Sequence, residues 1–467
     1  MVAAGYRGWQ WREDGRRLEA LRAEVAGANV VICVMDAARA DHLGCYGYPR
    51  PTTPNVDELA KESLVFTDHF CQFTRTKEST ASLFTSQYAD THLAYERRPL
   101  EDGTFTMAKG LSDAGLDTAL FSSNFNASPV PCLGPGFKET FYGDAVRAEL
   151  RKGETEWAPE PLLRLFGKWL AKRDGQRFFA YVHFTPPHQP YEFPGPMGKL
   201  FAGKQPPGYG PEKYHPLKYD FPIVPEETTQ DFPPLPEWIN LYDSNLRYAD
   251  WAVGEAVRQL REAGVLDKTL LIVTSDHGEA FGEHGFVWHG EPIHDEVGRI
   301  PLVIRFPKAS REGRVTALTQ SIDLLPMIFD LFRLSYPPDS IQGRSLAGLI
   351  AGNAQQVNRY AFTKAAKQGD KYMVRDQQYA LLLWGNGKWR ALYDLKADPE
   401  QRTDVLAQRP KEAAELTKAF RSFALKQRVP PLNFLDPAIP PPPLPPIKET
   451  DLPPDVERHL RALGYLK

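Results

Sequence analysis

Acidic residues and a histidine follow two apolar, β-branched stretches of the chain. Asp36 follows the stretch 29–35, and Asp276 and His277 follow the stretch 269–275. Such stretches are typical of parallel strands buried on both faces, and the carboxyl ends of these strands open into the crevice where α/β sheets place their sites. Two carboxylates and one imidazole form a ligand set for zinc, manganese or calcium, although calcium is less suited to nitrogen. The pattern predicts a metal site, while a carboxylate that caps the following turn is the alternative for Asp36.

A hydroxyl-rich segment, residues 71–86, turns into the start of a helix, and we place Thr76 at that start. Backbone N–H groups are unpaired at a helix N-terminus and the helix dipole is positive there, so a tetrahedral anion can dock where a nucleophile points. Taken alone, the segment also fits a loop that caps an ordinary helix. Lys77, the next residue, is a candidate for substrate binding, with a solvated lysine as the alternative.

Further polar side chains lie in loops after predicted strands. His188 belongs to the proline-stiffened loop 185–191, and Asn124 ends the next strand along the chain from Thr76. His284 and His289 lie on a glycine-rich loop after His277. We expect one of these two histidines to face the site.

Composition bounds the class of protein. The 467 residues are 42% hydrophobic and carry 56 basic and 59 acidic side chains, a net charge of -3. This balance gives no reason to expect nucleic acid or an anionic membrane as a partner. The chain shows no apolar run long enough for a signal peptide or a membrane span, which predicts a cytoplasmic protein, or a periplasmic one if a segment precedes Met1. Four cysteines form neither a disulfide framework nor a paired metal motif, and we expect them to be reduced: Cys33, Cys45, Cys71 and Cys132.

Strand and helix patterns alternate along most of the chain, which predicts an α/β fold. Expected strands cover residues 29–35, 117–124, 177–184, 269–275 and 299–305, and expected helices cover 54–66, 105–116, 160–172 and 238–263. Short alternating stretches in 358–395 predict a small antiparallel sheet, followed by a helix over 409–426.

These patterns divide the chain into four parts. We expect a helical extension (1–26), a catalytic domain (27–310) with a lid or rim (192–237), a C-terminal subdomain (311–428), and a proline-rich strap with a terminal helix (429–467).

The order of the motifs resembles that of the sulfatase family, which belongs to the alkaline phosphatase superfamily. The resemblance covers nearly the whole chain and rests on residues 36–41, 53–60, 76–86, 188–191, 275–279, 299–302, 343–346, 392–400 and 463–466. It implies an alkaline-phosphatase-like α/β sandwich with a central mixed, largely parallel sheet and a small C-terminal α+β subdomain.

Two departures from the family pattern concern the nucleophile. Sulfatases carry a Cys-x-Pro-Ser-Arg segment whose cysteine, or serine, is oxidised to formylglycine. When residues 76–80 are aligned with that segment, Thr76 takes the position of the oxidised residue. The lysine that sulfatases carry after the next strand has no counterpart, because residues 122–124 read Ser-Ser-Asn. A competing register makes Cys71 the nucleophile but needs an insertion before Ser82. The pattern looks closer to superfamily members with a threonine nucleophile, such as phosphoethanolamine transferases and phosphodiesterases.

The resemblance implies roles for individual residues and one divalent ion, zinc, manganese or calcium. The expected metal ligands are Asp36, Thr76, Asp276 and His277; the expected catalytic residues are Thr76, His188 and His289; the expected substrate-binding residues are Asn124 and Lys77. His289 is preferred over His284 because its Trp-His-Gly context matches a histidine of the transferases. The expected substrate is a small-molecule, lipid or glycan ester, with a phosphate mono- or diester as the preferred type. A sulfatase with an unusual nucleophile and a silent binding protein are the alternatives.

Overall fold

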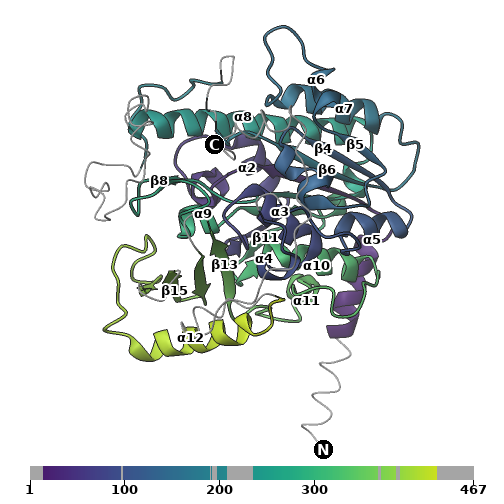
Figure 1. The fold of residues 1–467 in the computed structure, drawn as a ribbon. Coiled ribbons are helices and arrows are strands. Elements are labelled where there is room, and N and C mark those ends of the chain that lie inside the picture. Colours follow the sequence, from purple (N-terminus) through teal and green to yellow (C-terminus); the bar gives the residue numbers. More distant parts are fainter. Residues whose placement is uncertain are drawn as a thin grey trace, which may run out of the picture.

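A large mixed sheet lies between two layers of helices in the computed structural model, which describes residues 14–95, 98–189, 191, 197–207, 235–366, 370–384 and 390–428 (Figure 1). Its strand order is β11-β2-β10-β7-β1-β6-β4-β5. Only β10 runs against the other strands of this sheet. The strands are β1 (Asn29–Met35), β2 (Leu64–Phe66), β4 (Asp117–Ser122), β5 (Glu139–Phe141), β6 (Phe178–Phe184), β7 (Thr269–Thr274), β10 (Leu302–Arg305) and β11 (Gly313–Val315). The predicted alkaline-phosphatase-like sandwich is confirmed.

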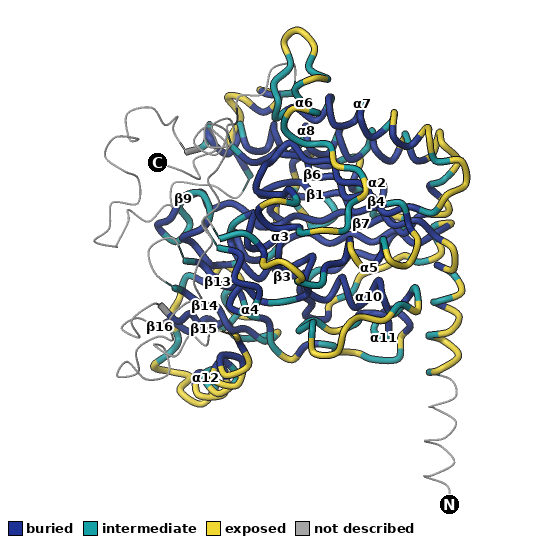
Figure 2. Tube along the Cα trace, turned by 45° about the vertical axis from the view of Figure 1, so that its right-hand side comes forward, coloured by how far each residue is buried: buried dark blue, intermediate teal, exposed yellow. Residues whose placement is uncertain are grey.

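Alternate residues of β1 enter two separate cores, as expected for a strand buried on both faces. Val31 and Cys33 pack in the core beneath α7 (Pro159–Leu170) and α8 (Leu235–Glu262). Val30 and Ile32 pack in the opposite core, which is covered by α3 (Thr76–Thr85), α5 (Met107–Asp113), α10 (Leu324–Leu331) and the helix over 14–24. Figure 2 shows the central strands as buried and the outer turns as exposed.

Parallel pairing brings the site-bearing loops to one edge of the sheet. Val34 of β1 is paired with His183 of β6 on one side and with Thr274 of β7 on the other. Asp36, the loop after β6 and the pair at 276–277 therefore emerge side by side. The remaining polar loop follows β4, which neighbours β6.

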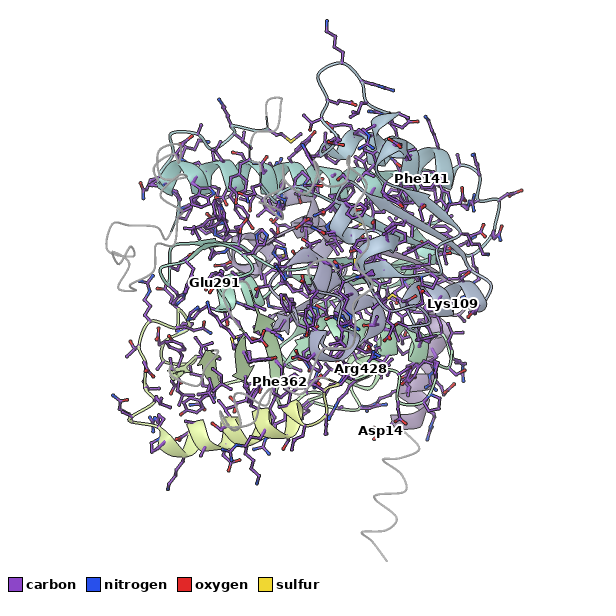
Figure 3. All side chains as sticks on the ribbon, viewed as in Figure 1. Asp14, Lys109, Phe141, Glu291, Phe362 and Arg428 are labelled. Carbon is purple, nitrogen blue, oxygen red and sulfur yellow. The ribbon has the colours of Figure 1, made fainter. Side chains whose placement is uncertain are left out.

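A second, four-stranded antiparallel sheet forms the centre of the C-terminal region. It consists of β13 (Ala361–Ala365), β14 (Lys371–Arg375), β15 (Tyr379–Trp384) and β16 (Arg390–Asp394), and α12 (Pro410–Ala424) covers one face. Phe362 of β13, which is labelled in Figure 3, stacks on Phe423 of α12 with 4.2 Å between the ring centroids. The backbone of Lys364 forms hydrogen bonds with the backbone of Gln72 and Thr74. The small sheet is therefore attached to the segment that directly precedes α3.

Short elements complete the described chain. They are α2 (Pro54–Ala60), α4 (Ala89–His92), α6 (Asp144–Arg147), α9 (Asp295–Gly298), α11 (Ala347–Ile350), η1 (Ala40–His42), η2 (Gly44–Tyr46), η3 (Phe125–Ala127), η4 (Pro129–Leu133), η6 (Leu266–Lys268), η7 (Pro307–Ala309), η8 (Ser321–Asp323), β3 (His69–Phe70), β8 (Ala280–Phe281), β9 (Val287–Trp288) and β12 (Thr319–Gln320).

The structure differs from the sequence prediction at several boundaries. The helix expected over 54–66 ends at Ala60, because the next apolar residues form β2 and pair with β10 and β11. Both β11 and α10 follow residue 310, where we placed the domain boundary, and both belong to the layers of the large sheet. The strap and terminal helix at 429–467 lie outside the described residues, as does most of the lid or rim at 192–237.

Candidate active site

Asp36 occupies the centre of the site, directly after the central strand β1. Its side chain is fully buried. Oδ2 accepts hydrogen bonds from Asn124 Nδ2 at 2.7 Å and from His183 Nε2 at 3.0 Å. Oδ1 lies 3.4 Å from the hydroxyl of Thr76. One oxygen of Asp36 thus accepts hydrogen bonds from neighbouring side chains, and the other lies next to the predicted nucleophile.

Thr76 is the first residue of α3, as predicted. Arg75 is the N-cap residue and is extended, so the helix starts directly at Thr76. The Thr76 side chain is fully buried, and its Oγ1 lies 3.2 Å from His277 Nε2. The hydroxyl therefore sits at the positive end of a ten-residue helix, where an anionic group is favoured.

Asp276 and His277 extend from β7 towards Thr76. Asp276 Oδ1 accepts hydrogen bonds from the backbone N–H groups of Ala37 at 3.1 Å and His277 at 3.0 Å. Asp276 Oδ2 is buried and has no hydrogen-bond partner among the described residues. A buried carboxylate oxygen without a donor is costly unless a cation binds it. This oxygen is the strongest indication of a metal ion at the site.

The tautomer of His277 fits metal binding. Its Nδ1 lies 2.8 Å from the carbonyl oxygen of Gly278, which can only accept a hydrogen bond. Nδ1 therefore carries a proton, and the atom that this tautomer would offer to an ion is Nε2. A hydrogen bond at the other ring nitrogen is the usual way in which a protein orients a metal-binding histidine.

Four candidate ligand atoms converge with the spacing that one ion needs. His277 Nε2 lies 3.2 Å from Thr76 Oγ1, 3.6 Å from Asp276 Oδ2 and 3.8 Å from Asp36 Oδ1, and the last of these oxygens lies 3.4 Å from Thr76 Oγ1. Tetrahedral zinc with bonds of about 2.0–2.1 Å has ligand atoms about 3.3 Å apart. The four residues predicted from sequence therefore fit a divalent ion.

Buried charges around Asp36 reinforce this arrangement. Burial alone would raise the pKa of Asp36, but the nearby His188 ring and the hydrogen-bonded His183 hold the pKa well below its usual range. Burial lowers the pKa of His183, but the hydrogen bond and charge of Asp36 outweigh burial and raise it. Asp36 is thus ionised and available to a cation.

His188 and His289 lie beside His277, as expected for residues that handle substrate. The His289 ring centroid lies 4.3 Å from that of His277 and 4.8 Å from that of His188. His188 Nδ1 lies 2.6 Å from the carbonyl oxygen of Gln189, and burial lowers the pKa of its ring. A neutral His188 that donates from Nδ1 has a lone pair at Nε2, so it suits a hydrogen-bond or proton acceptor better than the general acid predicted from sequence. His289 Nδ1 lies 2.9 Å from Glu279 Oε1.

Three further residues considered from the sequence do not contact the candidate ligand cluster in the same way. Asn124 reaches the site, where its side-chain amide donates a hydrogen bond to Asp36. Lys77, the second residue of α3, is buried and does not have the solvated side chain considered as its alternative. His284 does not join the site, because it pairs with Glu296 Oε1 at 2.8 Å.

A second cluster of potential ligands is formed by His284, His294 and Glu296. The two imidazole rings are stacked, with centroids 3.7 Å apart and planes 5° apart. An ion bound to a histidine nitrogen lies near the plane of that ring, and two parallel planes share no such position. This cluster therefore does not fit a metal ion in the observed geometry.

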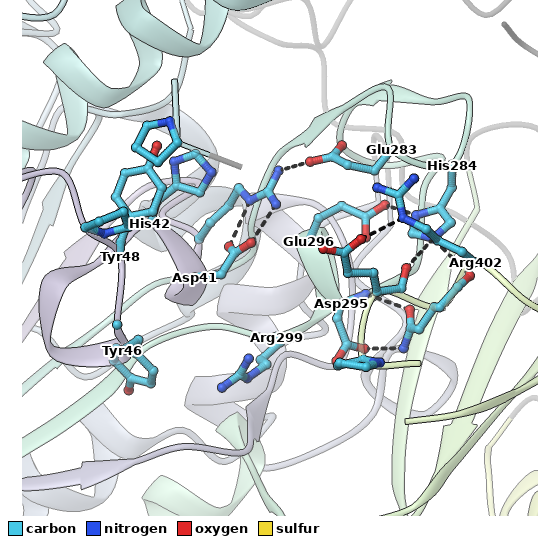
Figure 4. A pocket seen from close by; sticks show the side chains of 17 residues that line it. Asp41, His42, Tyr46, Tyr48, Glu283, His284, Asp295, Glu296, Arg299 and Arg402 are labelled. Carbon is cyan, nitrogen blue, oxygen red and sulfur yellow. Dashed lines mark hydrogen bonds and ion pairs between the residues drawn. The ribbon is translucent and has the colours of Figure 1, made fainter. Parts of the chain in front are cut away.

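A cavity of about 520 Å³ lies outside the predicted site, and none of the predicted site residues lines it (Figure 4). Arg39 lines it and forms ion pairs with Asp41 at 2.8 Å and Glu283 at 2.5 Å. The pairing of Arg39 with these two carboxylates indicates a structural role for this arginine.

Sequence reasoning missed His183 and Glu279. His183 is a titratable residue at the carboxyl end of an otherwise apolar strand, which is the signal that had identified Asp36. Glu279 follows His277 by two residues, but nothing in the sequence around it indicates a contact with Tyr191, which lies 88 residues away. Its role depends on contacts between loops that only the fold brings together.

No described helix combines the length and apolar character needed to cross a membrane.

Two family profiles and several known proteins match this chain. The sulfatase family profile matches residues 28–334, and the profile of the N-sulphoglucosamine sulphohydrolase C-terminal region matches residues 282–428. Human N-sulphoglucosamine sulphohydrolase is 28% identical over 329 residues, which are 64% of this chain and 60% of that protein, so the match spans less than two thirds of its length. An ulvan-active sulfatase of Formosa agariphila is 24% identical over 84% of this chain and 82% of its own.

A solved structure shows the same fold. The phosphonate monoester hydrolase of Agrobacterium radiobacter superposes with a TM-score of 0.71 at 22% identity, covering 85% of this chain and 95% of its own. Because the sulfatase profile covers well over half of the residues, the chain belongs to the sulfatase family of the alkaline phosphatase superfamily.

Proposed function

We propose that this protein is a metal-dependent ester hydrolase or transferase that uses Thr76 as its nucleophile, most effectively on phosphate mono- or diesters. One observation carries the proposal. Thr76 Oγ1 lies within 3.4 Å of both His277 and Asp36, and Asp276 has a buried oxygen with no hydrogen-bond donor among the described residues.

The ion would be held by Asp36, Thr76, Asp276 and His277. When bound, it would favour the deprotonated form of the threonine hydroxyl and offset negative charge on the substrate oxygens. The N-terminus of α3 adds backbone N–H groups and a positive dipole on the same side. His188, with its Nε2 lone pair, can accept a hydrogen bond from a substrate hydroxyl or from water.

A threonine nucleophile favours phosphoryl over sulfuryl transfer. Phosphothreonine can be cleaved by water or by an acceptor hydroxyl, whereas a sulfated threonine lacks the elimination route that an aldehyde hydrate provides. A difference of about 4 kcal/mol between the two barriers corresponds to roughly a thousandfold in rate. The relatives include both sulfatases and a phosphonate monoester hydrolase, so kinship alone does not select the ester.

Cys71 is the alternative nucleophile if the protein is a sulfatase with formylglycine. Its side chain is fully buried, its Sγ faces the carbonyl oxygen of Val297 at 3.6 Å, and burial raises its pKa. Thr76, in contrast, touches two of the candidate metal ligands. The geometry therefore favours Thr76.

The test is steady-state release of nitrophenol from a matched phosphate monoester, phosphate diester and sulfate. We expect turnover of a phosphate ester, at most one burst from the sulfate, and loss of turnover in Thr76→Ala but not in Cys71→Ala. Sustained sulfate turnover with an aldehyde at position 71 would establish the sulfatase alternative. A filled metal site without turnover of any ester would leave a binding protein.

A further inference from the structure

The short turn after Asp36 connects the two aspartates of the candidate metal site. Ala37, the next residue, has a φ of 62°, in the left-handed region that alanine rarely adopts. Its backbone N–H donates a hydrogen bond to Asp276 Oδ1 at 3.1 Å, so this one residue joins the end of β1 to the end of β7. The conformation of Ala37 therefore sets how Asp36 and Asp276 lie relative to each other.

A tyrosine of α8 holds this turn. The Tyr242 hydroxyl donates a hydrogen bond to the carbonyl oxygen of Ala37 and accepts one from the backbone N–H of Arg39, each at 2.9 Å. One hydroxyl thus bridges two backbone groups that lie two residues apart. Both residues are buried, so loss of the hydroxyl would leave a carbonyl and an N–H without this partner in a place shielded from water.

Ring packing fixes the position of the Tyr242 hydroxyl. The side chain is fully buried, and its ring packs edge-on against Phe281 with 4.8 Å between centroids and against His42 with 5.3 Å. A second restraint on the turn comes from Ser275, whose Oγ accepts a hydrogen bond from the backbone N–H of Ala38 at 2.9 Å. The turn is therefore held by side chains of two other segments, α8 and the end of β7.

We propose that Tyr242 is a positioning residue for the metal ion, because its hydroxyl keeps Ala37 in the left-handed conformation in which Asp36 and Asp276 converge. This inference rests on the metal site of the proposed function. The left-handed conformation is unfavourable for alanine and not for glycine. Without the hydroxyl the turn relaxes and the two carboxylates no longer meet at one point. Groups that orient metal ligands typically contribute about 10–100-fold to metal affinity.

Release of cobalt(II) to a chelator measures this role. Cobalt(II) binds the nitrogen and oxygen ligands that suit zinc, and its visible absorption reports the coordination geometry. We would load the full chain with cobalt(II), titrate it with EDTA and follow the absorption for the wild type, Tyr242→Phe, Ala37→Gly and the double variant.

Tyr46→Phe is the matched control, since it removes a hydroxyl that also bridges backbone groups. The Tyr46 hydroxyl donates to the carbonyl oxygen of Phe66 at 2.9 Å and accepts from the backbone N–H of Leu302 at 2.7 Å. These groups belong to β2 and β10, which carry none of the candidate ligands. Urea unfolding of each variant would be measured in parallel.

We expect Tyr242→Phe to weaken cobalt binding by about 10–100-fold and to change the visible spectrum, because the ligand atoms move. In the Ala37→Gly background the same change should cost less than about threefold, since glycine adopts the left-handed conformation without help from the hydroxyl. Tyr46→Phe should unfold at a lower urea concentration but bind cobalt as the wild type does, because only the fold loses hydrogen bonds.

The outcomes separate positioning from a merely structural role and from the proposed function. Unchanged cobalt affinity in Tyr242→Phe, an equal loss in the alanine and glycine backgrounds, an equal loss in Tyr46→Phe, or failure of Tyr242→Phe to fold would overturn the positioning role. A wild type that binds cobalt and turns over no ester would overturn the proposed function alone. A wild type that binds no cobalt would overturn both.

Discussion

Raising the pH should weaken the attachment of the loop 399–402 to the catalytic domain, because that attachment needs a protonated His284. Its Nδ1 lies 2.8 Å from Glu296 Oε1 and its Nε2 lies 3.0 Å from the carbonyl oxygen of Glu400. A carboxylate and a carbonyl both accept hydrogen bonds, so both ring nitrogens must carry protons. Burial alone would lower the pKa of His284, but the charge and hydrogen bond of Glu296 raise it to about 9.

The size of the effect follows from this pKa. The ordinary value is 6.5, and the side chain is only 10% exposed, so solvent screening is limited. The rise to about 9 corresponds to about 3 kcal/mol of stability. A pKa that is higher in the folded state gives a contribution that is fully present below the unfolded value and is lost as the pH rises through the folded value. The contribution of His284 to stability is therefore lost between about pH 6.5 and somewhat above pH 9.

Urea unfolding of the wild type and of His284→Gln, from about pH 6 to about pH 10, measures this contribution. The free-energy difference between the two proteins should shrink by about 3 kcal/mol across the window. Fluorescence and circular dichroism must report the same transition for the comparison to hold. His92→Gln is a suitable control, because burial lowers the pKa of His92 to about 3 and its contribution should not change in this range. Parallel stability curves for the wild type and His284→Gln would refute the reasoning.

Three further predictions concern the metal site. Thr76→Ala should abolish turnover with the fold intact by circular dichroism, whereas Cys71→Ala should be nearly silent and mass spectrometry should find no aldehyde; the reverse result would favour the other register. Elemental analysis should find one divalent ion per chain, and Asp276→Asn should lose it on dialysis because a charged ligand is gone; two ions, or none with activity in chelator, would contradict the site. Gly278→Ala should reduce bound metal, since its Cβ would meet a backbone oxygen of α9 at 2.2 Å, whereas Gly348→Ala, where nothing lies within 4 Å, should retain it.

The sequence predicts the large sheet well where strands are buried on both faces. Continuous apolar stretches such as 29–35 and 269–275 match β1 and β7 to within a residue. The helix expected over 54–66 fails because Leu64–Phe66 is a short apolar run whose state depends on pairing with β10, more than two hundred residues away. Local periodicity carries no information about such a partner.

The candidate site shows the same contrast between strand ends and loop contacts. Asp36, Asp276 and His277 are predictable because they end parallel strands, and parallel neighbours bring their ends together. Glu279 is not, because its contacts depend on Tyr191 and His289 approaching it from two separate loops.

The hydrogen bonds of the two aspartates also bear on how many ions the site can take. Asp36 uses Oδ2 for two side-chain donors, and Asp276 uses Oδ1 for two backbone donors. Each carboxylate therefore offers one oxygen towards Thr76 and His277, so the four residues supply four ligand atoms. His188 directs Nδ1 to a carbonyl and His289 directs Nδ1 to Glu279, so these two residues could add only imidazole nitrogens beside the four ligand atoms. Because divalent ions in proteins are rarely held by two imidazoles alone, the described residues favour a single ion, with both histidines left to act on the substrate.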